Sequence, residues 1–372
     1  MTKQQIKALW KLCFDDSDAF IDMYFRLRYN DEVNIAIESG KEVVSALQMI
    51  PYPMTFCGEQ IQTSYISGAC THPDFRGNGV MRELLSQAFA RMRYNRVVLS
   101  TLIPAEPWLF DYYARMGYMP VFRYSEKKIS QWDISPVPDI FITKLADANE
   151  EVYQYLDKKM SERSCCIQHT FSDFKVIFAD LLISKGTFYI ATVQEQIAGI
   201  AVVYPNSNGL QINELLTENS EIEKALLYHI RQEAGTDAIT MITPPMAAEE
   251  QYPLGMARII DARTILQFHA ALHPEIEMNI KLTDEQLAIN NGYYYLYKGK
   301  CKFSKERLLG SHRQLTIGEL CEKLLSPLQP YMSLMLNKQL SCKALSTNPF
   351  VLFFRFKDTE HPDVVKQNTR MF

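Results

Sequence analysis

The residues best suited to chemistry lie at positions 65–92, where a strand-like run, a glycine-rich turn and a helical pattern follow one another. The turn, Arg76-Gly77-Asn78-Gly79, has two residues without a Cβ, so its backbone N–H groups can approach a ligand closely. From Val80 onward the apolar residues recur at helical spacing. A glycine turn that opens a helix presents unpaired N–H groups and the positive end of the helix dipole. The pattern therefore predicts an anion site that suits a pyrophosphate.

These residues resemble a known family. Residues 76–81 resemble the R/Q-x-x-G-x-G/A pyrophosphate loop of GNAT acyltransferases, which bind acetyl-coenzyme A, although Met81 stands where Gly or Ala is usual. A second strand is expected at residues 97–101, and residues 108–118 resemble the F-Y-x-x-x-G-[FY] segment near the end of a GNAT domain. The two motifs at the expected separation favour a GNAT domain over an ordinary strand-to-helix turn.

The preceding residues have the element order of this family. Apolar residues at helical spacing predict helices at residues 6–14 and 20–27. Short strands are expected at residues 34–38, 43–51 and 61–70, with turns at Gly40 and at Cys57-Gly58-Glu59. Helices, a meander of strands, and then the glycine loop with its helix are the GNAT order, which implies a mixed α/β sheet.

The length of 372 residues allows two or three domains. Residues 1–130 are expected to form the catalytic GNAT domain, and residues 131–137 a linker. Residues 131–254 repeat the strand-then-helix order, but Thr217-Glu218-Asn219-Ser220 has no glycine and puts Glu218 where a phosphate would sit. We therefore expect a second GNAT domain that has lost cofactor binding. Residues 255–372 are expected to hold a small α/β module, with a hairpin across the Asn291-Gly292 turn and an amphipathic helix at 315–325.

Two GNAT domains followed by such a module resemble the enhanced-intracellular-survival (Eis) acetyltransferases. That family also has a bulky aliphatic residue at the position of Met81, and its third domain is sterol-carrier-protein-like. The resemblance covers nearly the entire chain. It implies an α/β fold with mixed sheets, made of tandem GNAT acyl-CoA N-acyltransferase domains followed by a sterol-carrier-protein-like domain. Because the family assembles as hexamers, it also implies a homo-oligomer.

The resemblance also implies a mechanism. An amine with a pKa of ~10.4 is almost entirely protonated at pH 7, so a general base is useful, yet residues 65–70 carry no carboxylate. In the Eis family the base is the carboxylate of the last residue, here Phe372, whose chain is expected to reach the first active site. The general acid of the family corresponds to Tyr113, with Tyr112 and Tyr118 as competitors for that role.

The remaining site residues fall into three groups. Backbone N–H groups near the end of the strand are expected to polarise the thioester of acetyl-CoA, the loop is expected to hold its pyrophosphate, and apolar and acidic residues are expected to line the acceptor pocket. In that order the groups are Ala69, Cys70 and Thr71; Arg76, Gly77, Asn78, Gly79, Val80 and Met81; and Asp22, Tyr24, Phe25 and Trp108.

Composition excludes several function classes. The net charge of −4, from 39 basic and 43 acidic residues, disfavours a nucleic-acid or anionic-membrane partner. The sequence has no apolar run long enough to span a bilayer and no leader-like start, so a cytoplasmic location is expected. The 8 cysteines lie scattered without C-x-x-C pairs, and no metal is expected.

The sequence therefore predicts an acetyl-CoA-dependent N-acetyltransferase that acts on a small-molecule or peptide primary amine by direct attack. Aminoglycosides, polyamines, peptide N-termini and lysine side chains stay open as acceptors. Among enzymes, the alternative is a longer-chain acyltransferase; protein N-myristoyltransferases also pair two GNAT halves with a C-terminal carboxylate, but the third domain argues against them. Outside enzymes, the alternative is a non-catalytic acyl-CoA or lipid-binding protein.

Overall fold

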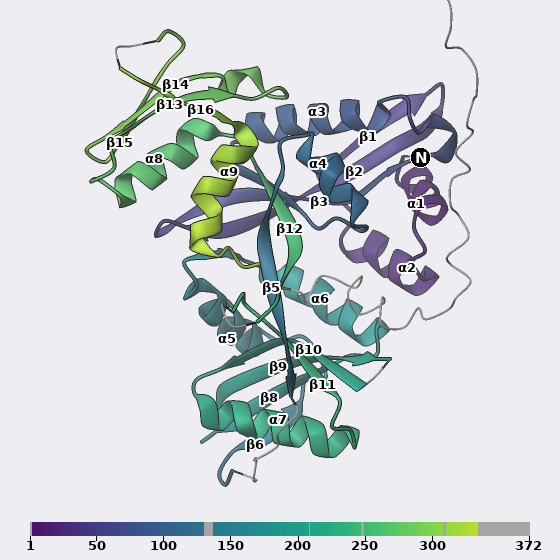
Figure 1. Ribbon diagram of the computed structural model, residues 1–372. Helices are drawn as coiled ribbons and strands as arrows, with labels where there is room; N and C mark the ends of the chain where they lie inside the picture. Colours follow the sequence, from purple (N-terminus) through teal and green to yellow (C-terminus); the bar gives the residue numbers. More distant parts are fainter. Residues whose placement is uncertain (1, 130–136, 208, 247–248, 308–309, 334–372) are drawn as a thin grey trace, which may run out of the picture.

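The computed structural model describes residues 2–129, 137–207, 209–246, 249–307 and 310–333. In this part of the chain, strands of two successive units hydrogen-bond into one large sheet of 12 strands, and a sheet of 4 strands lies beside it (Figure 1). No helix among these residues is long and apolar enough to cross a membrane. The predicted linker at residues 131–137 lies almost entirely outside the described residues.

The first unit has helices on both faces of its strands. Trp10 and Tyr24 pack with Ala46 on one face, whereas Leu84 packs with Leu47 on the other, because successive strand residues point to opposite sides. The elements are α1 (Thr2–Cys13), α2 (Asp18–Leu27), η1 (Asp31–Val33), β1 (Asn34–Ser39), β2 (Glu42–Phe56), β3 (Glu59–Thr71), η2 (Pro73–Phe75), α3 (Val80–Tyr94), β4 (Leu99–Leu102), α4 (Trp108–Ala114) and β5 (Met119–Ile129). The predicted helices and strands of this unit are confirmed, with ends that differ by a few residues.

The second unit repeats this order. Its elements are β6 (Phe141–Lys144), α5 (Glu150–Ser161), β7 (Cys165–Ile167), α6 (Phe171–Ile183), β8 (Thr187–Val193), β9 (Gln196–Asn206), β10 (Gly209–Thr217), α7 (Ser220–Ala234) and β11 (Ile239–Thr243). Helix α6 was not among the elements predicted from the sequence. Its start has a signal that could have revealed it, because Thr170 and Asp173 form a capping box at the first turn.

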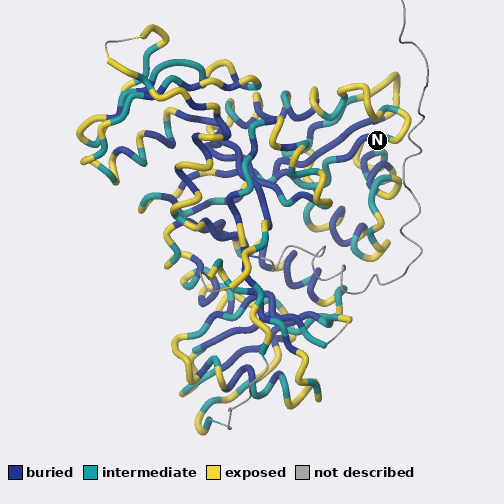
Figure 2. The backbone as a smooth tube through the Cα atoms, in the orientation of Figure 1, coloured by how far each residue is buried: buried dark blue, intermediate teal, exposed yellow. Residues whose placement is uncertain are grey.

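The two units share strands at the middle of the sheet. Strand β12 (Gln251–Ile259), which follows the second unit in sequence, lies between β4 and β5 of the first unit and is antiparallel to both. The far end of β5, residues 125–129, pairs with β11 of the second unit. Figure 1 shows β5 and β12 running together between the two units, and Figure 2 shows that both are buried for much of their length. The domain boundary predicted at 254/255 falls inside β12.

The third part of the chain packs a small sheet against two helices. Its elements are α8 (Ala262–Leu272), β13 (Met278–Thr283), η3 (Ala288–Asn290), β14 (Gly292–Tyr297), β15 (Lys300–Ser304), β16 (Arg313–Thr316), α9 (Ile317–Leu325) and η4 (Ser326–Leu328). The sheet order is β15-β14-β13-β16, and β13 is parallel to β16. Leu320, Leu324 and Leu325 of α9 are buried, as the predicted amphipathic pattern requires, whereas Leu315, predicted on this helix, lies on β16.

The hairpin predicted at Asn291-Gly292 is wrong. Strands β13 and β14 do pair, but residues 284–291 connect them with a longer loop that contains η3. The Asn291 side chain accepts a hydrogen bond from the Asp284 N–H and so serves the loop rather than a tight turn. The tight turn of this sheet is Lys298-Gly299 between β14 and β15, where both residues have positive φ, +47° and +75°.

Candidate acetyl-transfer site

Strands β3 and β4 separate before β3 ends. They pair in parallel only where Thr63, Ser64 and Tyr65 face residues 99–101, while β3 continues to Thr71. Beyond Tyr65 that edge of β3 therefore has no ladder partner on β4. We call this place the β3–β4 fork. A fork of this kind leaves backbone groups of β3 available to a ligand that enters between the strands.

A β-bulge lies on the free part of β3. Gly68 and Ala69 together oppose one residue, Leu47, because Ser67 pairs with Gln48 and Cys70 with Ala46. Gly68 has a φ of +61°, and a Cβ there would lie 2.1 Å from the Trp10 ring, so only glycine fits. Of the predicted thioester-binding residues, Cys70 and Thr71 keep partners on β2, whereas the bulge takes Ala69 out of register.

The glycine loop follows β3 and opens α3. Gly77 and Gly79 both have positive φ, +79° and +78°, and a Cβ on either would meet nothing within 4 Å. Gly79 is the N-cap residue of α3, and no side chain caps this helix in the described structure. Gly77, Asn78 and Gly79 are exposed, while Val80 and Met81 are half-buried. The first-turn N–H groups of α3 therefore have no side-chain cap in the described structure, which is the arrangement that an anion site requires.

The Arg76 side chain contacts the end of β3 and the end of α1. Its Nε donates to the Thr71 carbonyl oxygen at 3.0 Å, and its Nη2 lies 3.7 Å from Cys13 Sγ at the end of α1. These contacts tie the glycine loop to the end of β3. A hydrogen bond from Cys70, together with Arg76, lowers the pKa of the Cys13 thiol to about 6.

The corresponding helix of the second unit has no such opening. The Asn219 side chain accepts hydrogen bonds from the N–H groups of Glu221 and Ile222 at the start of α7. Glu221 and Glu223 lie in the first turn, and Glu218 precedes the cap. A capped and acidic helix start disfavours an anion. This contrast supports the prediction that the second unit has lost cofactor binding.

Tyr113 lies on α4, beneath α3. Its ring packs edge-on against Tyr112 at 5.4 Å and Tyr118 at 5.7 Å, and it shares a buried cluster with Leu84 and Leu102 at the end of β4. Burial raises the pKa of Tyr113 above its ordinary value. The Tyr118 hydroxyl is engaged with Ser100 Oγ at 2.7 Å, as expected for a residue that packs in the sheet.

The predicted acceptor residues lie in different places. Tyr24 lies on the α1–α2 face of the sheet, where its hydroxyl donates to Ser67 Oγ at 2.9 Å, beside the bulge. Asp22 is exposed and forms an ion pair with Lys7, and Phe25 is buried between α1 and α2. Trp108 is 64% exposed at the start of α4. Phe372, the predicted general base, lies outside the described residues.

A buried polar cluster that was not predicted from the sequence lies on the same face as Tyr24. It consists of Arg28, Tyr52, His169 and Asp173, two residues from each unit. No local pattern could have revealed it, because a separation of 145 residues lies between Arg28 and Asp173.

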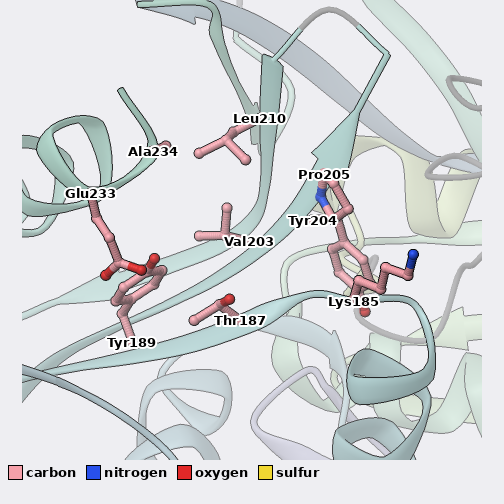
Figure 3. Close-up of a pocket in the computed structure, with 9 residues that line it drawn as sticks. All are labelled: Lys185, Thr187, Tyr189, Val203, Tyr204, Pro205, Leu210, Glu233 and Ala234. Atoms are coloured by element: carbon pink, nitrogen blue, oxygen red, sulfur yellow. The ribbon is translucent and has the colours of Figure 1, made fainter. Parts of the chain in front are cut away.

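A cavity of about 180 Å³ lies elsewhere, in the second unit (Figure 3). Tyr189 and Glu233 line one side of it, Lys185 and Tyr204 the other, and Leu210 stands at the start of β10. The cavity therefore lies next to the C-terminal end of α7, where an anion is disfavoured. It does not correspond in position to the glycine loop of the first unit. Among the described residues no group of three or more His, Cys, Asp or Glu side chains could hold a metal ion.

Comparisons with known proteins agree with this geometry. Residues 2–121 match the model of the acetyltransferase (GNAT) domain. The sequence matches no curated protein. Among solved structures, a GCN5-related N-acetyltransferase from Anabaena variabilis is similar with a TM-score of 0.70 and 17% identity, covering 86% of each chain.

Two further structures extend the comparison. A probable N-acyltransferase from Enterococcus faecalis has a TM-score of 0.68 and 17% identity over 85% of each chain. Eis1 from Mycobacterium abscessus has a TM-score of 0.66 and 11% identity over 87% of each chain. At these identities the likeness shows the fold alone, and it extends over all three parts of the chain. Together with the family match over residues 2–121, it shows a GNAT fold with mixed α/β sheets.

Proposed function

We propose that this protein is an acetyl-CoA-dependent N-acetyltransferase that transfers an acetyl group to a primary amine at the β3–β4 fork. The observation that carries the proposal is the uncapped start of α3, which opens from two positive-φ glycines directly after the bulged end of β3. The loop would bind the pyrophosphate of acetyl-CoA, and the free edge of β3 would receive the thioester. The second unit has a capped helix at the corresponding place and is not proposed to bind the cosubstrate.

Tyr113 is the proposed donor to the departing thiolate. A thiol has an ordinary pKa of ~8.5, and the pKa of Tyr113 stands above the phenol value of ~10. Because the pKa of the buried phenol is higher than that of the thiol, proton transfer from Tyr113 to the thiolate is unfavourable in the free protein. Tyr113 therefore stabilises the developing charge on sulfur as a hydrogen-bond donor, and complete proton transfer requires the bound coenzyme to change this balance.

The finer parts of the proposal rest on the family resemblance. They are the Phe372 carboxylate as general base, a sterol-carrier-protein-like third module, a homo-oligomer and a cytoplasmic location. In the described structure the chain reaches Ser333 beside β7, where Tyr331 and Ser333 both donate to buried Glu214.

The experiment that tests the proposal measures acetyl-CoA affinity and amine-dependent thiol release for the intact protein, across aminoglycosides, polyamines and lysine peptides. Turnover with any of these amines supports the proposal. Acetyl-CoA binding without turnover on any amine would favour a non-catalytic acyl-CoA-binding protein. Absence of acetyl-CoA binding would overturn the proposal.

The role of Phe372 needs its own variants. One lacks Phe372, and the other carries a few added residues after it. Loss of turnover in both, with acetyl-CoA affinity unchanged, is the expected result if its carboxylate takes the proton from the amine. Full activity in both would remove Phe372 from the mechanism while leaving the acetyltransferase activity itself in place.

A further inference from the structure

The two units meet next to the proposed acceptor side of the fork. Strand β7 of the second unit pairs with the far end of β2, and the Gln168 N–H donates to the Pro53 carbonyl at 2.8 Å. Helix α6 lies against α2 of the first unit (Figure 1). This junction brings His169 and Asp173 of the second unit to Arg28 and Tyr52 of the first.

Both carboxylate oxygens of Asp173 accept hydrogen bonds in this cluster. One carboxylate oxygen accepts from Arg28 Nη1, and the other accepts from the N–H and the hydroxyl of Thr170, both at 2.8 Å. Arg28 and Asp173 carry opposite charges, so the pair has no net charge. The guanidinium of Arg28 lies 5.0 Å from the centre of the Tyr52 ring. Its Nη2 is buried and has no hydrogen-bond partner in the described part of the chain.

His169 is 6% exposed, and its ring stands edge-on to Tyr52 at 4.9 Å. Neither Nδ1 nor Nε2 has a hydrogen-bond partner among the described residues, although the His169 carbonyl accepts from Tyr153. Burial lowers the pKa of His169 to about 4, so the imidazole is neutral at pH 7. A neutral imidazole has one N–H donor and one acceptor nitrogen.

Buried polar atoms without partners are uncommon in folded proteins, and three of them in one cluster indicate a missing partner. The charges restrict its chemistry. An ammonium group would meet the Arg28 guanidinium, and a carboxylate would meet Asp173. A hydroxyl group carries no charge. It can accept a hydrogen bond from Arg28 Nη2 and donate one to the unprotonated ring nitrogen of His169, so its chemistry matches both groups.

The cluster is also close to the fork. The ring of Tyr52 lies 6.2 Å from that of Tyr65, the last residue of β3 that pairs with β4. The pKa of Tyr65 is raised by burial and by the neighbouring phenols of Tyr24 and Tyr113. Tyr65 and Ser67 point to one face of β3, which is the face of Tyr24. The Tyr52 ring therefore lies next to the cluster on one side and next to Tyr65 at the fork on the other.

We propose that Arg28 and His169 form a subsite that binds a hydroxyl group of the acceptor amine, so that the second unit contributes to substrate recognition at the active site of the first. The inference rests on the proposed function, because it takes the fork as the place where the acceptor reacts. It assigns the second unit, which lacks an anion-binding helix start, a direct part in choosing the acceptor.

The test compares two amines that differ by one hydroxyl, diaminopropane and the diaminopropanol with its hydroxyl on the central carbon. Binding of each to the full-length protein is measured by calorimetry, with and without coenzyme A. The proteins are wild type, His169→Leu, His169→Gln and the control His229→Leu, which changes a partly exposed histidine on α7. We expect wild type to bind the diaminopropanol about tenfold more tightly, His169→Leu to lose that preference, and His169→Gln to keep part of it.

The outcomes separate this inference from the proposed function, because calorimetry needs no turnover. A hydroxyl preference that His169→Leu abolishes supports the subsite even in a protein that releases no thiol. Equal affinities for the two amines in wild type, or failure of both to bind, would overturn it and leave the cluster to a buried water. Tighter binding of β-alanine than of the diaminopropanol would also overturn it. If His169→Leu does not fold, His169→Gln and Arg28→Lys decide by the same comparison.

Discussion

Tyr113 and Tyr118 belong to one short segment and are both buried, yet their hydroxyls have different surroundings. That of Tyr118 is engaged with Ser100, which makes it a structural residue. Tyr113 lies where α3, α4 and the end of β4 meet, next to the fork. Position relative to the fork, rather than burial, therefore distinguishes the proposed hydrogen-bond donor from its competitor.

We expect Tyr113→Phe to lower kcat by about a hundredfold, because the thiolate loses its only proposed side-chain donor. The affinity for acetyl-CoA should change little, since the loop that is proposed to hold the pyrophosphate is untouched. Steady-state kinetics and equilibrium acetyl-CoA binding measure the two effects. Tyr118→Phe is the matched control and should lower stability without a comparable loss of kcat. Equal turnover by Tyr113→Phe and wild type would exclude this role.

Cys13 gives a prediction about pH. Its pKa is lowered to about 6 by Cys70 and Arg76, whereas burial raises the pKa of half-buried Cys57 to about 11. The thiolate is the reactive form, and its fraction rises as the pH increases through the pKa. Iodoacetamide should therefore modify Cys13 with a half-maximal rate near pH 6, and Cys57 only at much higher pH. Peptide mass spectrometry across pH 5 to 9 measures both sites. Indistinguishable pH profiles would contradict the prediction.

At the scale of elements, helices α3 and α7 occupy corresponding positions in the two units but differ at their first turns. Helix α3 begins after a positive-φ glycine and has no side-chain cap in the described structure, whereas α7 begins at Asn219, whose side chain takes two of its N–H groups. The strands before them are alike, since β10 and β11 also pair in parallel over only three residues, 210–212. The difference lies in the cap and not in the architecture.

We expect Gly79→Ala to weaken acetyl-CoA binding about tenfold. An alanine at φ +78° strains the backbone by about 1 kcal/mol and turns the first N–H groups of α3 away from the pyrophosphate. Gly235→Ala is the control, because Gly235 also has a positive φ, +61°, and open space around it, but follows α7. The two variants should lose similar stability in thermal unfolding, and only Gly79→Ala should lose affinity. Equal affinity in both would show that the loop does not hold the cosubstrate.

At the scale of the whole molecule, a buried ion pair joins the third part to the large sheet. Arg258 on β12 is 0% exposed and donates to Asp284 Oδ1, to the Met116 carbonyl and to the Ile259 carbonyl. Asp284 also accepts from Asn290 in the loop after β13. Met116 precedes β5, so one guanidinium connects the segment after Tyr113 to β12 and to the third part of the chain.

Asp284→Ala should lower the free energy of unfolding by about 3–5 kcal/mol, because it leaves the Arg258 guanidinium buried without its counter-ion. Asp237→Ala, which removes an exposed partner of Arg231, should lower it by about 1 kcal/mol or less. Urea denaturation of both variants gives the comparison. Similar losses would mean that the buried pair is not a principal link between the parts.

The sequence by itself determined the local features of this protein. The glycine loop, its helix and most strands of the first unit could be predicted because periodicity, capping residues and turns act over a few neighbouring positions. Helix α6 begins with a capping box, which is a local signal of the same kind. The hairpin at Asn291-Gly292 was predicted wrongly because a side-chain contact to Asp284 outweighs the turn preference of that dipeptide.

Only the tertiary structure decided what lies between distant residues. Nothing local in residues 251–259 indicates that β12 separates β4 from β5, since strand order depends on pairing partners far away in the chain. The same holds for the bulge at Gly68, where Trp10 occupies the space that a side chain would need, and for the cluster of Arg28, Tyr52, His169 and Asp173. Local residues determined where the glycine loop forms, because its physics is that of one turn and one helix end. The surroundings of the proposed acceptor site were decided by packing between two units.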